Sequence, residues 1–294
     1  MVYILENDEL ILTVDSLGAE IKSLKSKING KEYMWSGDKR YWGRTAPVLF
    51  PVVGSLKNKQ FTYQDEVYNI GQHGFARDLE HILKRKSDDE IWFELVESDE
   101  TRKKYPFRFI LNIGYRLSGH SVEVMWKVTN PSEKNLYFAI GGHPTLVCPI
   151  HNENDKSEYS IYFNTTSDKL VYKRLDRETS LVMNEESSLE LEDGYVNISP
   201  QFFDTSAYVF ENNQCSEVAL VSPDKKHYIT VKFEESTFGL WSPEGKNAPF
   251  VCIEPWNGRG DSIGFNGTLE ERETMTKLAS NDVYESRYYI VVEP

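Results

Sequence analysis

The sequence predicts an all-β fold, a sandwich or a barrel built from roughly fifteen or more short strands. Three observations support this: apolar and polar residues alternate with a period of two along most of the chain, helical periodicity is nearly absent, and turn signals separate the apolar runs. The 294 residues are 39% hydrophobic and 13% aromatic, which is enough for a large core and excludes extended disorder. No Pro/Gly/Ser-rich linker or internal repeat divides the chain, so we expect one domain over residues 1–294.

The first half of the chain predicts a series of strands, beginning with Leu10–Val14 before a turn at Gly18. Further strands are expected at Phe61–Tyr68, Glu90–Val96, Phe107–Leu117 and Ser121–Thr129. Ser118, Gly119 and His120 form a hairpin-type turn between the last two. In Ser121–Thr129 the apolar residues fall at alternate positions, as a half-buried antiparallel strand requires.

The second half continues in strands and contains one helix-like segment. Strands are expected at Glu158–Phe163, Ala207–Phe210, Glu217–Val221, Tyr228–Phe233, Phe238–Trp241, Phe250–Glu254 and Arg287–Pro294. Leu269–Ala279 has the charged, Leu- and Met-bearing composition of a helix, and one short helical turn is expected at Leu79–Leu83. We expect surface loops at His151–Ser157 and Asp176–Gly194.

Charge and cysteine content exclude several classes of function. With 33 Lys+Arg against 46 Asp+Glu, the formal charge is −13, which disfavours nucleic acid and anionic membranes as partners. Cys148, Cys215 and Cys252 lie far apart with no CxxC pair, so neither a disulfide scaffold nor a zinc site is predicted. Because no signal peptide or membrane span is recognisable, we expect a soluble protein of the reducing cytoplasm.

Two of the six histidines stand in unusual surroundings. His73 lies in Gly-Gln-His-Gly-Phe-Ala-Arg and His143 in Ile-Gly-Gly-His-Pro. Glycine removes side-chain cover and lets a ligand approach the backbone, so these imidazoles are expected to face a cavity. The alternative is a turn histidine bonded to backbone. The other four lie among charged or turn residues, where a solvated imidazole is expected: His81, His120, His151 and His227.

A carboxylate and two arginines complete the candidate site. Glu254 ends the apolar run Val-Cys-Ile-Glu and precedes Pro and Trp256, whose indole could stack on a sugar ring or simply belong to the core. A solvated or salt-bridged glutamate is the alternative. Arg44 and Arg77 flank the same motifs and could bind hydroxyls, carboxylates or phosphates, or form structural ion pairs.

Together these residues suggest proton transfer. The sequence has no nucleophile-elbow serine, no phosphate loop and no dinucleotide-binding glycines, and a paired-carboxylate glycosidase would need a second acid. Two imidazoles and one carboxylate fit general acid–base catalysis.

Four motifs resemble those of the aldose 1-epimerases, most closely the galactose-mutarotase-like branch found beside bacterial lactose genes. They are RTAPVLFPVVG at Arg44–Gly54, HGFAR at His73–Arg77, GGHP at Gly141–Pro144 and EPWNG at Glu254–Gly258, in the family's order. The resemblance covers essentially the whole chain. It implies a large, twisted, antiparallel β-sandwich with very little helix, and interconversion of the α and β anomers of a hexose without a cofactor or a metal.

The resemblance also implies roles for single residues. Glu254 resembles the general base that deprotonates the anomeric hydroxyl, and His143 the general acid that protonates the ring oxygen. His73 resembles the second imidazole, which hydrogen-bonds the ring oxygen or an adjacent hydroxyl.

The substrate stays open at this point. Galactose mutarotases carry a hydroxyl-binding Asp where this chain aligns Ser206, so the resemblance implies a substrate-binding role for Ser206 but does not imply a preference for galactose. Arg44 and Arg77 match arginines that relatives acting on hexose 6-phosphates use for the phosphate, which makes a phosphorylated hexose an alternative substrate. A non-catalytic carbohydrate-binding protein is a further alternative, because fold does not fix function. We expect a monomer or homodimer whose partner is a small sugar.

Overall fold

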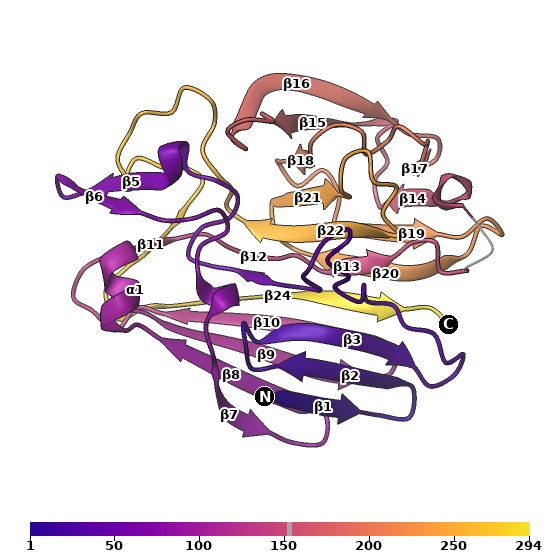
Figure 1. Ribbon diagram of the computed structural model, residues 1–294, viewed down its shortest axis with the longest axis horizontal. Coiled ribbons are helices and arrows are strands. Elements are labelled where there is room, and N and C mark those ends of the chain that lie inside the picture. Colours follow the sequence, from indigo (N-terminus) through magenta and orange to yellow (C-terminus); the bar gives the residue numbers. More distant parts are fainter. Residues whose placement is uncertain (152–154) are drawn as a thin grey trace.

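The computed structural model describes residues 1–151 and 155–294, and these residues form 24 β-strands in five sheets (Figure 1). Their one α-helix is α1 (Asp99–Lys104), and three 3-10 turns occupy Lys57–Lys59, Ala76–Asp78 and Lys156–Glu158. The predicted all-β fold is therefore confirmed. Within the described ranges, no helix is long and apolar enough to cross a membrane.

The larger sheet has nine antiparallel strands, drawn from both halves of the chain. In spatial order they are β17 (Tyr195–Asn197), β14 (Ser160–Phe163), β19 (Glu217–Val221), β20 (His227–Phe233), β24 (Val283–Val292), β10 (Ser121–Thr129), β9 (Ile110–Ser118), β8 (Glu90–Val96) and β7 (Ile82–Lys86). Strand β24 lies at the centre, between β20 and β10. The last described strand therefore joins the early strands of the sheet to the later ones.

The second large sheet has eight strands. They are β16 (Val182–Glu190), β15 (Lys169–Leu175), β18 (Tyr208–Phe210), β21 (Thr237–Trp241), β22 (Phe250–Asn257), β12 (Ile140–Gly142) and β4 (Val48–Leu49), with β13 (Thr145–Val147) also paired to β22. The two large sheets pack face to face through aromatic rings, because Phe238 on β21 meets both Phe233 on β20 and Phe163 on β14. This is the predicted sandwich.

Three small sheets complete the fold. They comprise β1 (Val2–Glu6), β2 (Leu10–Asp15) and β3 (Glu20–Ser26); the hairpin β5 (Gln60–Tyr63) and β6 (Glu66–Asn69); and the pair β11 (Leu136–Phe138) and β23 (Thr276–Leu278). The main apolar core is shared by residues from Leu5 to Val292.

Several predicted elements are wrong in detail. Leu269–Ala279 is not a helix: it is a run of turns followed by strand β23. Leu269 is buried in the core and Arg272 is buried against Asp261, at 2.8 Å, so tertiary contacts outweigh the helical composition. Phe61–Tyr68 is a hairpin rather than one strand, with Gln64 and Asp65 turning at positive φ.

The predicted loops also differ from the structure. Asp176–Gly194 contains β16, an edge strand whose exposed polar side chains hide the alternation that marks other strands. Part of His151–Ser157 lies outside the described residues, whereas Lys156 in it is buried. The short turn expected at Leu79–Leu83 lies earlier, at Ala76–Asp78, and β7 begins at Ile82.

Candidate active site

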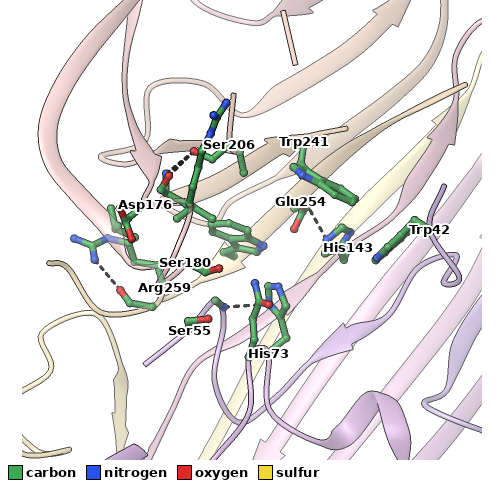
Figure 2. Close-up of a pocket in the computed structure, with 18 of the residues that line it drawn as sticks. Trp42, Ser55, His73, His143, Asp176, Ser180, Ser206, Trp241, Glu254 and Arg259 are labelled. Atoms are coloured by element: carbon green, nitrogen blue, oxygen red, sulfur yellow. Dashed lines mark hydrogen bonds and ion pairs between the residues drawn. The ribbon is translucent and has the colours of Figure 1, made fainter. Parts of the chain in front are cut away.

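A cavity of about 390 Å³ lies on the face of the eight-stranded sheet that points away from the nine-stranded sheet (Figure 2). Strand β22 shows which face this is: Val251 and Ile253 belong to the core between the sheets, whereas Glu254 and Trp256 line the cavity. All seven sequence-predicted site residues line this one cavity: Arg44, His73, Arg77, His143, Ser206, Glu254 and Trp256.

His143 and Glu254 lie in direct contact at the base of the cavity. His143 follows β12, where its backbone N–H donates to the Pro47 carbonyl at 3.1 Å, and Glu254 lies within β22. The His143 Nε2 atom is 3.2 Å from Glu254 Oε1, and both residues are buried. An acid and a base are therefore held within hydrogen-bonding distance at one end of a cavity.

Burial sets the protonation of this pair. It lowers the pKa of His143 to about 3, and the positive charges of Arg77 and Arg44 act in the same direction. Burial raises the pKa of Glu254 well above its usual value, although the neighbouring Trp256 indole opposes the rise. Burial therefore favours the uncharged form of both groups, an imidazole beside a protonated carboxyl that can pass its proton across the 3.2 Å contact.

His73 is fixed in one tautomer by Gly54. The Gly54 backbone N–H donates to His73 Nδ1 at 3.0 Å, and the His73 backbone N–H donates back to the Gly54 carbonyl at 2.8 Å. Because Nδ1 is an acceptor, the neutral ring carries its proton on Nε2. Burial lowers the pKa of His73 well below its usual value, with smaller contributions from His143, Arg77 and Arg44. His73 therefore offers a hydrogen-bond donor to the cavity.

The glycines before His143 serve packing rather than ligand approach. A Cβ on Gly141 would lie 2.7 Å from the Trp256 ring, and one on Gly142 would lie 2.6 Å from the Tyr288 hydroxyl. Gly141 thus leaves room for an indole on the cavity face, and Gly142 for a tyrosine of β24 between the sheets. The motif faces a cavity as expected, but the physical reason for its glycines is different.

The two predicted arginines lie close together and are partly paired. Arg44 contacts Asp78 at 2.5 Å. Arg77 donates to the Gln72 carbonyl at 2.8 Å, and its buried Nε lies 4.0 Å from Asp78 Oδ2 without a hydrogen bond to any described residue. The two guanidiniums share the Asp78 carboxylate, and the charge of Glu20 also acts on Arg77.

Ser206 and Trp256 line the cavity in ways the sequence did not predict. The Ser206 hydroxyl donates to the Leu175 carbonyl at 2.6 Å and accepts from the Leu175 N–H at 2.9 Å, so its hydrogen bonds already hold β15. Trp256 is 3% exposed and packs in a cluster with Leu49, Val53, Ala139 and Val209. Its faces are covered, which favours the core interpretation over a stacking platform for sugar.

Sequence reasoning missed several lining residues. Trp42 and Trp241 flank His143, and Trp42 could have been found because it stands two residues before Arg44. A polar group of residues forms the opposite wall: Asp176, Arg177, Ser180, Glu244 and Arg259. Asp176 and Ser180 belong to the segment predicted as a surface loop, so nothing in their local sequence pointed to a site. His81, expected to be solvated, is instead buried, which lowers its pKa to about 4.

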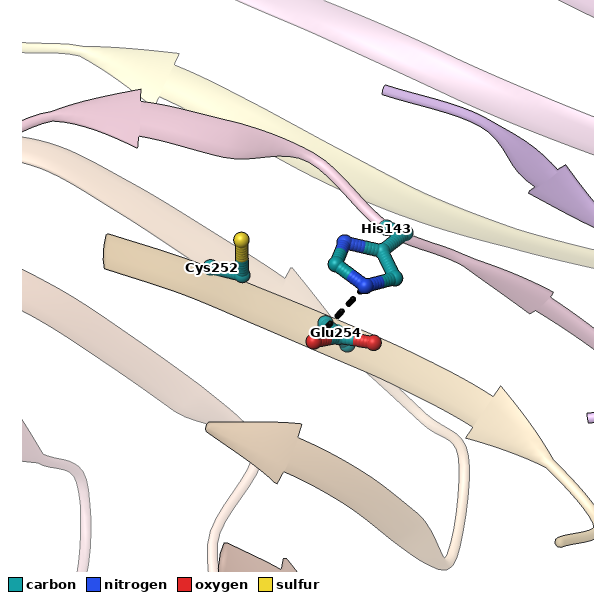
Figure 3. A group of neighbouring side chains, drawn as sticks. All are labelled: His143, Cys252 and Glu254. Atoms are coloured by element: carbon teal, nitrogen blue, oxygen red, sulfur yellow. Dashed lines mark ion pairs between the residues drawn. The ribbon is translucent and has the colours of Figure 1, made fainter. Parts of the chain in front are cut away.

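One group of neighbouring side chains among the described residues contains donor atoms of the kind that bind metals. Donor atoms of His143, Cys252 and Glu254 lie within 4.8 Å of one another, a donor set that zinc could accept (Figure 3). Burial raises the pKa of the Cys252 thiol, which lies 3.3 Å from the Thr145 hydroxyl, and His143 and Glu254 already bond each other. Because the thiol is protonated and the other two side chains are in contact with each other, the cluster does not fit a metal ion.

Comparisons with known proteins agree on one family. The sequence model of the family described as aldose 1-epimerase matches residues 1–277. Protein LacX of Lactococcus lactis subsp. lactis is 28% identical over 295 residues, which cover 98% of each chain. A galactose mutarotase related enzyme from Lactobacillus acidophilus has a TM-score of 0.94 at 31% identity, covering 100% of this chain and 98% of its own. A galactose mutarotase-like protein from Lactobacillus casei has a TM-score of 0.91 at 27% identity, with both chains fully covered.

Proposed function

Because the chain belongs to the aldose 1-epimerase family, we propose that it interconverts the α and β anomers of a hexose by acid–base-catalysed ring opening. The observation that carries this proposal is the buried contact of 3.2 Å between His143 and Glu254 in a cavity of about 390 Å³. Mutarotation needs one proton removed from the anomeric hydroxyl and one delivered to the ring oxygen. A pair that shares a single mobile proton can do both.

Ring opening uses the charged arrangement of the pair, a Glu254 carboxylate beside a His143 imidazolium. Glu254 takes the proton from the anomeric hydroxyl, the bond from C1 to the ring oxygen breaks, and His143 protonates that oxygen. The products are the open-chain aldehyde, a protonated Glu254 and a neutral His143, which is the protonation that burial favours. Rotation about C1–C2 and reclosure with the roles reversed give the other anomer and return the proton.

His73 supports the same step without exchanging a proton. Its Nε2–H is a donor because Gly54 occupies Nδ1, and its lowered pKa keeps the ring neutral. A fixed neutral donor near His143, with ring centroids 5.8 Å apart, can stabilise negative charge that develops on the ring oxygen.

A hexose 6-phosphate is the second candidate substrate, and the position of the arginines favours it. In a pyranose, C6 is attached to the carbon next to the ring oxygen, so a 6-phosphate lies on the side of the general acid. Arg44 and Arg77 lie close enough to His143 to lower its pKa, and Asp78 is the acidic residue that forms an ion pair with both, while Glu20 acts on Arg77 from a greater distance. The buried Arg77 Nε makes no hydrogen bond to the described residues and could donate one to an anion or a hydroxyl.

The test compares anomer exchange catalysed by the wild type and by a variant that lacks the Glu254 carboxylate. Relaxation of fresh α-D-glucose and α-D-galactose is recorded by polarimetry, and exchange of glucose 6-phosphate by NMR. We expect acceleration by the wild type and a loss of about 10²–10⁴ in kcat for Glu254→Gln. Glu235→Gln is the matched control, because Glu235 is a buried carboxyl with a raised pKa outside the cavity.

The outcomes separate the alternatives. Faster exchange of the phosphate ester, lost selectively in Arg77→Gln, would assign the arginines to the phosphate. Saturable sugar binding without acceleration on any of the three sugars would overturn the enzyme and leave a carbohydrate-binding protein. The reducing cytoplasm remains our expected location, to which three free, buried cysteines are suited.

A further inference from the structure

His143 lacks the hydrogen bond that usually orients a catalytic imidazole. One ring nitrogen, Nε2, faces Glu254, whereas the buried Nδ1 has only the backbone of His143 itself beside it and no partner on another described residue. In most acid–base histidines a carbonyl or carboxylate holds the second nitrogen and so fixes the ring plane. Something else must fix the plane of this ring.

Aromatic side chains surround the imidazole instead. The Trp42 ring is stacked on it, with centroids 4.6 Å apart and planes inclined by 26°. Trp241 and His73 lie at 5.8 Å, nearly perpendicular to it, at 81° and 82°. Trp42 alone covers a face of the imidazole in a parallel arrangement, as Figure 2 shows.

Trp42 is itself held in place. Its backbone N–H donates to the Asp38 carbonyl at 3.0 Å, and its own carbonyl accepts the Trp35 indole N–H at 2.9 Å. Its ring packs against those of Trp241 and Phe250, with ring centroids 5.5 Å and 6.3 Å away. An indole fixed on both backbone and ring can fix the imidazole that it covers.

The stack also acts on charge. Arg44 and Arg77 oppose a positive charge on His143, and the surrounding Cys252 and His73 are neutral. The backbone of His143 itself favours the imidazolium, and so do a Glu254 carboxylate and the π face of Trp42. A cation over an indole is stabilised more when water is excluded, as it is at this buried ring.

We propose that Trp42 is a positioning residue for the proposed epimerase reaction: its stacked indole orients the His143 ring and stabilises the imidazolium that donates to the ring oxygen. The inference rests on the proposed function for its kinetic consequence, and on the stack alone for its effect on His143.

The kinetic test compares Trp42→Leu with Trp42→Phe. Leu keeps apolar bulk but removes the π face, so we expect kcat to fall about 3- to 30-fold with little change in KM. Phe retains a face and should restore most of kcat. Trp241→Leu removes a perpendicular indole from the same cavity and should lower kcat less than Trp42→Leu does.

An NMR test does not depend on turnover. In protein with ¹³C-labelled histidine rings, the His143 signal should begin to move at a higher pH in the wild type and Trp42→Phe than in Trp42→Leu. Equal onsets, or a rise in KM at constant kcat, would overturn the proposal and assign Trp42 to sugar binding. If the wild type does not accelerate anomer exchange, the proposed function fails, whereas the NMR comparison still decides the effect of the stack.

Discussion

At the residue scale, the cost of placing charge on a buried imidazole determines the pH range of activity. Burial lowers the pKa of His143 to about 3, so the pair takes up its second proton only in strong acid. We expect kcat/KM to stay level as the pH falls through 6.5, the ordinary value for His, and to decline only towards about 3. Stopped-flow polarimetry, with circular dichroism to check folding, measures this. An acidic limb near 6.5 would show that His143 is solvated in the working enzyme.

The alkaline side follows from the other member of the pair. Above the raised pKa of Glu254 the pair loses its single proton, and no acid remains for the ring oxygen. The same profile therefore declines as the pH rises, with an apparent pKa above the ordinary value for Glu. In Glu254→Gln this alkaline decline should disappear from any residual activity.

The sequence allowed the residues of the candidate site to be predicted better than their surroundings. His73, His143 and Glu254 could be selected because short motifs mark them, and the cavity contains all three. Their protonation could not be predicted, since it depends on burial by segments distant in sequence. Trp42 could have been selected for its place two residues before Arg44, but its stacking on His143 could not be predicted, because the two residues lie far apart in the sequence.

At the element scale, the floor of the cavity depends on glycines in the strands beside β22. Gly239 on β21 pairs with Glu254, and a Cβ there would lie 2.5 Å from the Trp256 ring. We expect Gly239→Ala to destabilise the protein by about 1–3 kcal/mol through overpacking and to lower kcat by displacing β22. Urea unfolding and polarimetry measure the two effects.

Matched variants identify the cause of that loss. Gly71→Ala adds the same methyl where no atom lies within 4 Å, so it should leave stability nearly unchanged. The double variant Gly239→Ala, Trp256→Phe should lose less free energy of unfolding than the sum of the two single variants, because the smaller ring makes room for the methyl group. Additive losses would place the clash elsewhere.

Element prediction succeeded for strands that are rich in buried apolar residues. Residues 90–96, 121–129 and 217–221 were predicted with the bounds found, because short apolar runs between turn signals mark strands whether one face or both are buried. It failed for β16, an exposed edge strand, and for residues 269–279, where the buried Arg272–Asp261 ion pair holds turns in a helix-like sequence. Local pattern carries no information about such partners.

At the scale of the whole molecule, each of the two large sheets combines strands from both halves of the chain. Strand β24 joins β10 to β20, and β22 joins β12 to β21. We therefore expect a single unfolding transition, with equal calorimetric and van't Hoff enthalpies. Ile290→Ala shortens a fully buried side chain of β24. It should lower the unfolding midpoint by the same amount whether unfolding is followed by near- or by far-ultraviolet circular dichroism. Two separate transitions would contradict the expected single domain.

The central position of β24 also has a consequence for protein synthesis. Residues 283–292 are the last of these strands to leave the ribosome, and until they do, β10 and β20 each present an unpaired edge on either side of a gap. A nascent or truncated chain without them exposes two templates for pairing with other chains. The yield of folded protein should therefore depend on complete synthesis and on chaperone supply. This dependence should be stronger than in a protein whose central strands are synthesised early.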